Sequence, residues 1–276
     1  MKDWTCLEES PRDGAINMRV DAALLQFVEK APFRATVVRI YRWNCPTVSI
    51  GKHQEPYQAV DISICSEKRI PIVQRPSGGR AVLHDDEITY AIASNDERHF
   101  PLHSCRQLYL SIAHPLQWGL GKLGIPTELA PRRGDLAAPR SIDPLKRPCF
   151  STAARYELIS SGRKLVGNAQ RRLRRGFLQH GSLPLRLNRS LAAQVLGVSS
   201  QLLAQQTISL SEAAGREVTF GEVGRTLLQA FVQSFHMGRE RRLCTSEVLL
   251  EALSAAKPTS GGRTVSRIAA RQTSML

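Results

Sequence analysis

The residues of this 276-residue chain that could act as nucleophiles are its six cysteines, at positions 6, 45, 65, 105, 149 and 244. No two form a CxxC pair, and the seven histidines do not add the short, repeated spacings that zinc sites need. We therefore expect no metal site. In a reducing compartment each cysteine is then either a small apolar core residue or a nucleophile that reacts as its thiolate.

A second candidate for chemistry is the segment Arg75-Pro76-Ser77-Gly78-Gly79-Arg80, which lies between two strand-like runs. Two adjacent glycines allow positive φ and let the backbone approach a ligand closely. The flanking arginines could meet an anionic group. The segment lacks the GxxxxGK[ST] pattern of a nucleotide phosphate loop. A tight turn between strands has the same composition, so a ligand loop and a plain turn both remain open at this point.

The chain is strongly basic, with 38 Lys and Arg against 24 Asp and Glu, a net charge of +14. The densest run is Arg171-Arg172-Leu173-Arg174-Arg175. This excess favours an anionic partner such as nucleic acid, a phosphorylated ligand or an acidic protein, although a solvated basic face has the same composition. No apolar run is long enough to span a bilayer, and the N-terminal residues lack the apolar segment of a secretory signal. We therefore expect a cytoplasmic protein that does not contact a membrane.

The elements that must position these residues follow from hydrophobic periodicity and turn residues. Helices are expected at about 14–32, 104–123, 189–196, 200–205, 221–235 and 246–256. Strands are expected at 36–41, 47–51, 70–74, 81–84, 87–93 and 177–187, with a hairpin of 155–159 and 164–168 and an irregular connection over 131–148. The pattern predicts an α+β fold, a mixed sheet flanked by helices with a helical C-terminal portion.

Several blocks of the chain resemble one known superfamily. The run Arg75-Pro-Ser-Gly-Gly-Arg-Ala-Val-Leu-His84-Asp85, followed by Glu87-Ile-Thr-Tyr90, resembles the signature loop of the biotin/lipoate protein ligases and transferases. Pro148-Cys149-Phe150, Tyr156-Glu157-Leu158, Gly162 to Gly167 and Leu178 to Pro184 resemble, in order and spacing, the cysteine-dependent octanoyl-[acyl-carrier-protein]:protein octanoyltransferases. Arg80 stands where ATP-using lipoate ligases typically have a third glycine. The resemblance implies a biotin/lipoate ligase-like catalytic domain over residues 1–240. The residues after it do not resemble the family, and their pattern predicts a C-terminal helix and tail over 241–276.

The resemblance also implies site residues. Cys149 would carry the acyl group as a thioester, and Lys164 would lower the pKa of that cysteine. A cysteine of pKa about 8.5 is only about 3% ionised at pH 7, whereas a pKa of about 7 would ionise half of it. The groove for the acyl chain would use the following residues: Arg75, Gly78, Gly79, Arg80, His84, Gly167 and His180.

The implied activity is transfer of an octanoyl group to a specific lysine, a step of lipoate biosynthesis. The donor would be octanoyl-acyl carrier protein, and the acceptor a lipoyl domain or the glycine cleavage H protein. Because the acyl group arrives already activated, no ATP or other cofactor is required. Both protein partners are expected to be acidic, which would suit the basic chain.

Three alternatives remain open from the sequence. The first is an ATP-dependent lipoate ligase on the same fold, and the second an amidotransferase that moves octanoyl between lipoyl proteins. The third is a basic nucleic-acid-binding or regulatory module, which the absence of interleaved aromatics and of a recognition-helix pattern disfavours. We therefore expect no nucleic-acid partner.

Simpler roles also apply to individual residues. Without Cys149 nearby, Lys164 would be an exposed hairpin lysine. His84 and His180 are expected to be strand histidines hydrogen-bonded to backbone. Tyr41, Trp43 and Phe33 are expected in the core, and the other five cysteines are expected to be structural.

Overall fold

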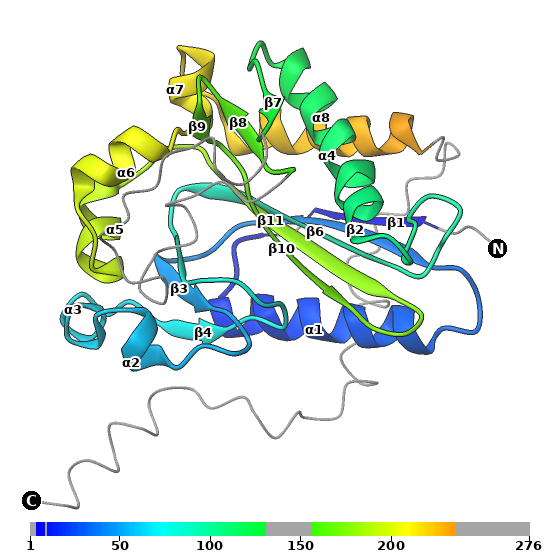
Figure 1. Ribbon diagram of the computed structural model, residues 1–276, viewed down its shortest axis with the longest axis horizontal. Helices are drawn as coiled ribbons and strands as arrows, with labels where there is room; N and C mark the ends of the chain where they lie inside the picture. Colours follow the sequence, from blue (N-terminus) through cyan, green and yellow to red (C-terminus); the bar gives the residue numbers. More distant parts are fainter. Residues whose placement is uncertain (1–3, 9, 131–155, 236–276) are drawn as a thin grey trace, which may run out of the picture.

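The computed structural model describes residues 4–8, 10–130 and 156–235, and its centre is a five-stranded mixed sheet (Figure 1). The strands lie in the order β1-β2-β6-β11-β10. Their bounds are Trp4–Glu8 for β1, Thr36–Tyr41 for β2, Glu87–Ser94 for β6, Phe177–Pro184 for β11 and Gly167–Arg172 for β10. β1 and β2 are parallel and the other neighbours antiparallel. The predicted mixed sheet is therefore confirmed.

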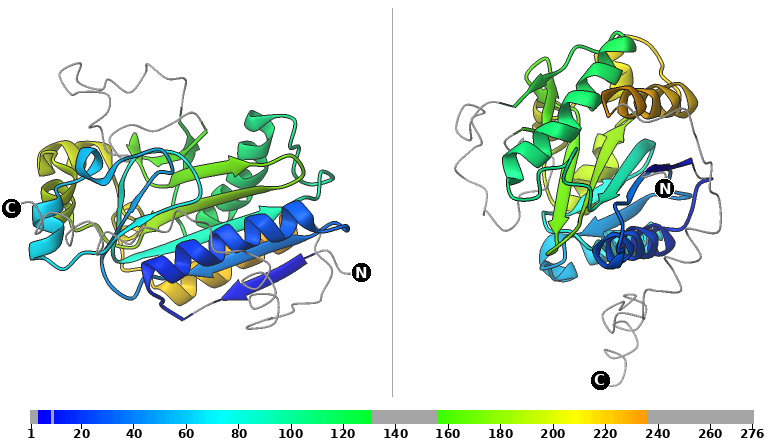
Figure 2. Two further views of the ribbon diagram at one scale, coloured as in Figure 1. Left: turned by 90° about the horizontal axis from the view of Figure 1, so that it is seen from below. Right: turned by 90° about the vertical axis from the view of Figure 1, so that its right-hand side faces the viewer.

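Helices cover both faces of this sheet. In the right-hand view of Figure 2, α1 (Gly14–Lys30) lies below the sheet, and α4 (Cys105–Lys122) and α8 (Phe220–Ser234) lie above it. The strands follow the period of two that this requires. In β6, Ala91 and Ala93 belong to the core cluster on the α1 side, whereas Ile88 and Ile92 belong to the cluster under α4 and α8. A sheet buried on both faces explains why these strands are almost continuously apolar.

Two smaller sheets flank the central one. The first has the order β4-β3-β5, and the second the order β7-β8-β9. Their bounds are Ile72–Gln74 for β4, Thr47–Ile50 for β3, Val82–His84 for β5, Glu128–Leu129 for β7, Leu158–Ser160 for β8 and Arg163–Lys164 for β9. The short helices are α2 (Pro56–Ala59), α3 (Ile62–Glu67), α5 (Arg189–Leu196), α6 (Ser200–Gln206) and α7 (Leu210–Ala214). The β4-β3-β5 sheet and α5 share a third apolar cluster that includes Val48, Ile50 and Val195.

Most expected elements that lie in the described residues are confirmed to within two residues, but one was wrong and several short ones were missed. The strand expected at 164–168 is in fact the end of β9 and the start of β10, which belong to different sheets. Leu165 and Val166 separate the two strands, and their N–H groups both bond to the Leu158 carbonyl at 3.1 and 3.2 Å. Leu165 and Val166 are both fully buried at this point.

The missed elements are β1, α2, α3, β7 and α7. All have six residues or fewer and carry no clear periodic signal. The connection at 131–148, Cys149, the helix at 246–256 and the boundary between 240 and 241 lie outside the described residues. Within the described part of the chain, no helix is long and apolar enough to cross a membrane.

Candidate active site

A pocket opens between the central sheet and the β4-β3-β5 sheet. The empty space inside it, together with the open solvent at its mouth, is about 370 Å³. It is lined by Met18, Tyr41, Trp43, Ser49, Arg75, Val82, His84, Thr89, Gly167, Asn168, Ala169, His180, Gly181 and Ser182. Four of the predicted groove residues, Arg75, His84, Gly167 and His180, are therefore brought together. Gly78, Gly79 and Arg80 are not among the lining residues.

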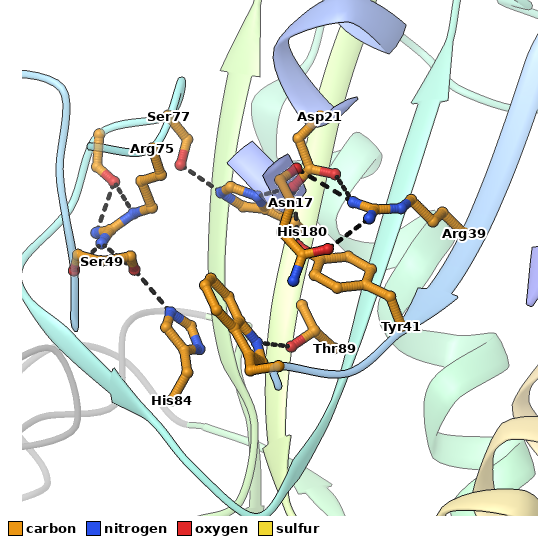
Figure 3. Close-up of polar contacts among 12 residues, drawn as sticks. Asn17, Asp21, Arg39, Tyr41, Ser49, Arg75, Ser77, His84, Thr89 and His180 are labelled. Atoms are coloured by element: carbon orange, nitrogen blue, oxygen red, sulfur yellow. Dashed lines mark hydrogen bonds and ion pairs between the residues drawn. The ribbon is translucent and has the colours of Figure 1, made fainter. Parts of the chain in front are cut away.

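The glycine segment forms a tight loop held by its own arginine (Figure 3). The buried guanidinium of Arg75 donates to the carbonyls of Ser49 at 2.9 Å, Gly78 at 2.9 Å and Arg80 at 2.6 Å. Gly79 has φ +94°, which favours glycine. A Cβ on Gly51 would lie 2.0 Å from the Gly79 carbonyl oxygen, so the loop contacts the backbone of Gly51, the residue after β3. Arg75 thus shapes the loop, because its guanidinium binds two loop carbonyls and the carbonyl of Ser49 in β3.

His180 connects this loop to the central helix α1. Its Nε2 lies 2.6 Å from Ser77 Oγ, and its Nδ1 lies 2.9 Å from Asp21 Oδ2 (Figure 3). Because the carboxylate accepts, Nδ1 carries a proton, and in the neutral ring Nε2 accepts from the Ser77 hydroxyl. The histidine is bound by side chains. The expectation of backbone hydrogen bonds was therefore wrong for His180.

Asp21 anchors this array in the core. Its carboxylate accepts from the Arg39 guanidinium at 2.8 Å and the Tyr41 hydroxyl at 2.9 Å, and Asp21, Arg39 and Tyr41 are all fully buried. Burial alone would raise the pKa of Asp21, but the hydrogen bond from His180 and the Arg39 charge outweigh it and lower that pKa. Burial, reinforced by the Asp21 charge, holds the pKa of Tyr41 well above its usual value. Asp21 is therefore an anion and Tyr41 a neutral donor.

His84 has a parallel arrangement on the other side of the pocket. Its Nε2 lies 2.7 Å from Ser49 Oγ and its Nδ1 lies 2.8 Å from Glu87 Oε1. Its ring stacks on Trp43 with centroids 4.0 Å apart. Here too the expected backbone partners were wrong, because side chains supply both contacts. With their polar atoms paired, the rings of Trp43 and His84 can offer apolar faces to a ligand.

Lys164 lies behind the pocket wall in a buried ion pair. Its Nζ is 2.7 Å from Glu157 Oε2, and each side chain is only 2% exposed. The other carboxylate oxygen, Oε1, accepts from the backbone N–H of Asn168, a pocket residue, at 3.2 Å. Lys164 is thus not the exposed hairpin lysine that its position alone suggested. It is a desolvated cation next to the pocket wall.

The remaining predictions on individual residues have mixed outcomes. Cys65 is buried, and burial raises the pKa of its thiol to about 11, as expected of a structural cysteine. Cys105 is exposed, so the expectation of a core residue was wrong there. Tyr41 and Trp43 are core residues as predicted, whereas Phe33 is 42% exposed because it lies in the loop after α1.

Sequence reasoning missed Asp21, Ser77 and Glu157 as site residues. Ser77 and Glu157 belong to blocks that carried the family resemblance, yet no role was assigned to them. One signal was available for Asp21. It follows Asn17 by one helical turn on the otherwise apolar face of α1, where a polar residue needs a buried partner.

Residues 13–232 match the model of the lipoyl protein ligase A/B catalytic domain. The chain therefore belongs to this family, which agrees with the fold and the pocket.

Similar curated proteins carry a more specific name. The octanoyltransferase LipM of Moorella thermoacetica is 34% identical over 241 residues, which cover 84% of this chain and 86% of that protein. The octanoyltransferase LipM of Oceanobacillus iheyensis is 32% identical over 262 residues, covering 92% and 93%.

Solved structures share the fold at lower identity. Protein Ta0514 of T. acidophilum, with bound lipoic acid, has a TM-score of 0.71 at 18% identity and covers 92% of this chain and 93% of its own. A lipoate-protein ligase A bound with ATP has a TM-score of 0.69 at 19% identity, covering 92% of each chain. These likenesses confirm the predicted biotin/lipoate ligase-like α+β fold.

Proposed function

We propose that this protein is an octanoyltransferase of lipoate biosynthesis, which takes octanoyl from octanoyl-acyl carrier protein and transfers it to a lysine of a lipoyl protein through a thioester on Cys149. The proposal draws on the relatives named octanoyltransferase and on the site. The single structural observation that carries it is the Lys164 ammonium, buried against the wall of an apolar pocket.

The first step is thioester exchange. The Cys149 thiolate attacks the octanoyl carbonyl, the tetrahedral intermediate collapses, and the carrier thiolate leaves and takes up a proton. One thioester replaces another, so the step is close to thermoneutral. A nearby ammonium favours the thiolate, and we assign this role to Lys164.

The second step forms an amide. The neutral ε-amine of the acceptor lysine attacks the enzyme thioester, loses its proton, and expels the Cys149 thiolate. Both tetrahedral intermediates carry an oxyanion that needs hydrogen-bond donors. The amide is more stable than the thioester, and this difference drives the transfer without ATP.

The pocket would hold the octanoyl chain. Met18, Tyr41 and Trp43 offer carbon surface, and the histidine rings beside them have their nitrogens paired with serines and carboxylates. A buried alkyl chain gains about 0.8 kcal/mol for each methylene removed from water. Arg75, which lines the pocket, holds the glycine loop beside it through the Gly78 and Arg80 carbonyls.

The acidic partners would be drawn to a basic surface. Arg172, Arg174 and Arg175 are exposed at the turn between β10 and β11, the strands that line the pocket. Charge steering of this kind speeds association and fades as salt screens it. We assign the reaction to the cytoplasm, where a catalytic thiol stays reduced.

The test is transfer with defined donors. Purified protein is incubated with octanoyl-acyl carrier protein and an acceptor lipoyl domain, with no ATP, and the acceptor mass is followed. We expect an octanoyl adduct on the acceptor lysine, absent with Cys149→Ala. A requirement for ATP and free acid would instead identify a ligase, and transfer only from an octanoylated lipoyl protein would identify an amidotransferase.

A further inference from the structure

We infer that Glu157 is a positioning residue for this reaction, which holds the Lys164 ammonium next to Asn168 of the pocket wall. The inference rests on the proposed function, because it takes Lys164 to act on Cys149.

The backbones of both partners are fixed by their surroundings. Glu157 immediately precedes β8, and its carbonyl accepts from the Ala130 N–H at 2.7 Å. Lys164 is paired with Ile159 across the β8-β9 hairpin, and its carbonyl accepts from the Ile208 N–H at 3.0 Å. The carboxylate and the ammonium are therefore presented to each other by one short hairpin, with little freedom in either backbone.

The two oxygens of Glu157 have different partners. Oε2 binds Lys164 Nζ at 2.7 Å, and Oε1 accepts from the Asn168 N–H at 3.2 Å. Asn168 is itself fixed, since its Oδ1 accepts from the buried Tyr90 hydroxyl at 2.7 Å. Burial raises the pKa of Tyr90 far above its usual value, so this hydroxyl remains a donor. One carboxylate thus couples the ammonium directly to the pocket wall.

A lysine needs such an anchor more than most residues. Its four-carbon stem has many rotamers, and a buried ammonium is costly without a partner. Its effect on a neighbouring thiolate falls with distance, so a displaced ammonium stabilises the thiolate less. Glu157 therefore acts by fixing where the Lys164 charge lies.

The direction in which removal of Glu157 changes the pKa of Cys149 distinguishes a positioning role from a direct charge effect. Glu157 is an anion, so if charge alone mattered, its removal would favour the Cys149 thiolate and lower the pKa of Cys149. If Glu157 positions Lys164, its removal frees the ammonium and raises the pKa of Cys149. We predict the rise.

The experiment is the pH profile of Cys149 alkylation by iodoacetamide, with peptide mass spectrometry to separate Cys149 from the other cysteines. With Glu157→Gln, we expect the rate at pH 7 to fall at least about threefold. The rate should not fall by more than about 15-fold. This is the loss of thiolate at pH 7 if the pKa of Cys149 rose from about 7 to the ordinary cysteine value of about 8.5. The whole profile should move to higher pH, with an unchanged rate once the thiol is fully ionised.

The matched control is Glu212→Gln, which breaks the 2.8 Å ion pair with Arg189 near the surface and should leave the profile as in the wild type. A double-mutant cycle with Lys164→Met adds a second readout. Because Glu157 acts through Lys164, Glu157→Gln should cause no further rise in the pKa of Cys149 in the Lys164→Met background. If Glu157→Gln does not fold, Glu157→Asp is measured in its place. For this variant we expect a smaller shift of the alkylation profile to higher pH.

An unmoved or lowered Cys149 profile in the folded Glu157 variants would overturn the positioning role. If Lys164→Met also leaves the pH profile of Cys149 alkylation unchanged, the result would count against the proposed action of Lys164 on Cys149. The two failures are therefore distinguishable within one set of measurements.

Discussion

Asp21→Asn is the substitution whose effect on stability can be worked out most directly from the structure. The change keeps the shape of the side chain but removes the negative charge opposite Arg39, whose guanidinium is 0% exposed. Breaking a buried ion pair by removing one partner costs about 3–5 kcal/mol, because the other charge stays buried. A domain of this size loses about 2–4 °C of melting temperature per kcal/mol, so we expect a fall of about 6–20 °C.

The assay is thermal unfolding followed by circular dichroism, with Tyr41→Phe as the matched control. Tyr41→Phe removes an uncharged hydrogen bond to the same carboxylate, which is worth about 1 kcal/mol.

The difference in stability between the wild type and Asp21→Asn should also depend on pH. Because the pKa of Asp21 is lowered in the folded state, its contribution is fully present above the ordinary aspartate pKa of about 3.9 and disappears as the pH falls through the folded value. A fall in melting temperature no larger than that of Tyr41→Phe would refute the assignment of Asp21 as the counter-charge of Arg39.

Three further changes test the glycine loop and an ion pair near the surface. Gly51→Ala should destabilise the fold by about 1–3 kcal/mol and abolish most transfer activity. The new Cβ would lie 2.0 Å from the Gly79 carbonyl oxygen and would displace the loop. Turnover of the octanoyl donor at the wild-type rate would contradict this prediction. Ser77→Ala should cost about 1–3 kcal/mol in chemical denaturation by leaving the buried His180 Nε2 without its partner, and an unchanged midpoint would count against the contact. Glu212→Gln should change stability at neutral pH by less than about 1 kcal/mol, because the pair is partly exposed. The Glu212 pKa of about 2 means that wild type alone loses this contribution as the pH falls below about 4.3, so acid titrations of the two proteins should converge.

The central elements were predictable because their patterns are long and local. The helix at 14–30 alternates apolar and polar positions over almost five turns, and its N-cap Asp13 accepts from the Ala15 N–H at 2.7 Å. The strands at 36–41 and 87–94 are apolar runs bounded by turn residues, as expected of strands covered on both faces.

The partners of the site residues were not predictable, because they are set by tertiary distance. Asp21 and His180 are 159 residues apart, and Ser77 and His180 are 103 apart. Nothing in the local sequence indicates that these side chains meet. Arg75 illustrates the same point, since an arginine beside two glycines looks like an anion ligand until the loop carbonyls around it are seen.

Trapping the acyl-enzyme tests most directly whether Cys149 carries the acyl group. The protein is incubated with octanoyl-acyl carrier protein without acceptor, quenched in acid, and analysed by peptide mass spectrometry before and after hydroxylamine. We predict one octanoyl group on the Cys149 peptide, removed by hydroxylamine and absent from Cys149→Ala. Octanoylation of the acceptor at the normal rate by Cys149→Ala would contradict the role of Cys149 as the acyl carrier.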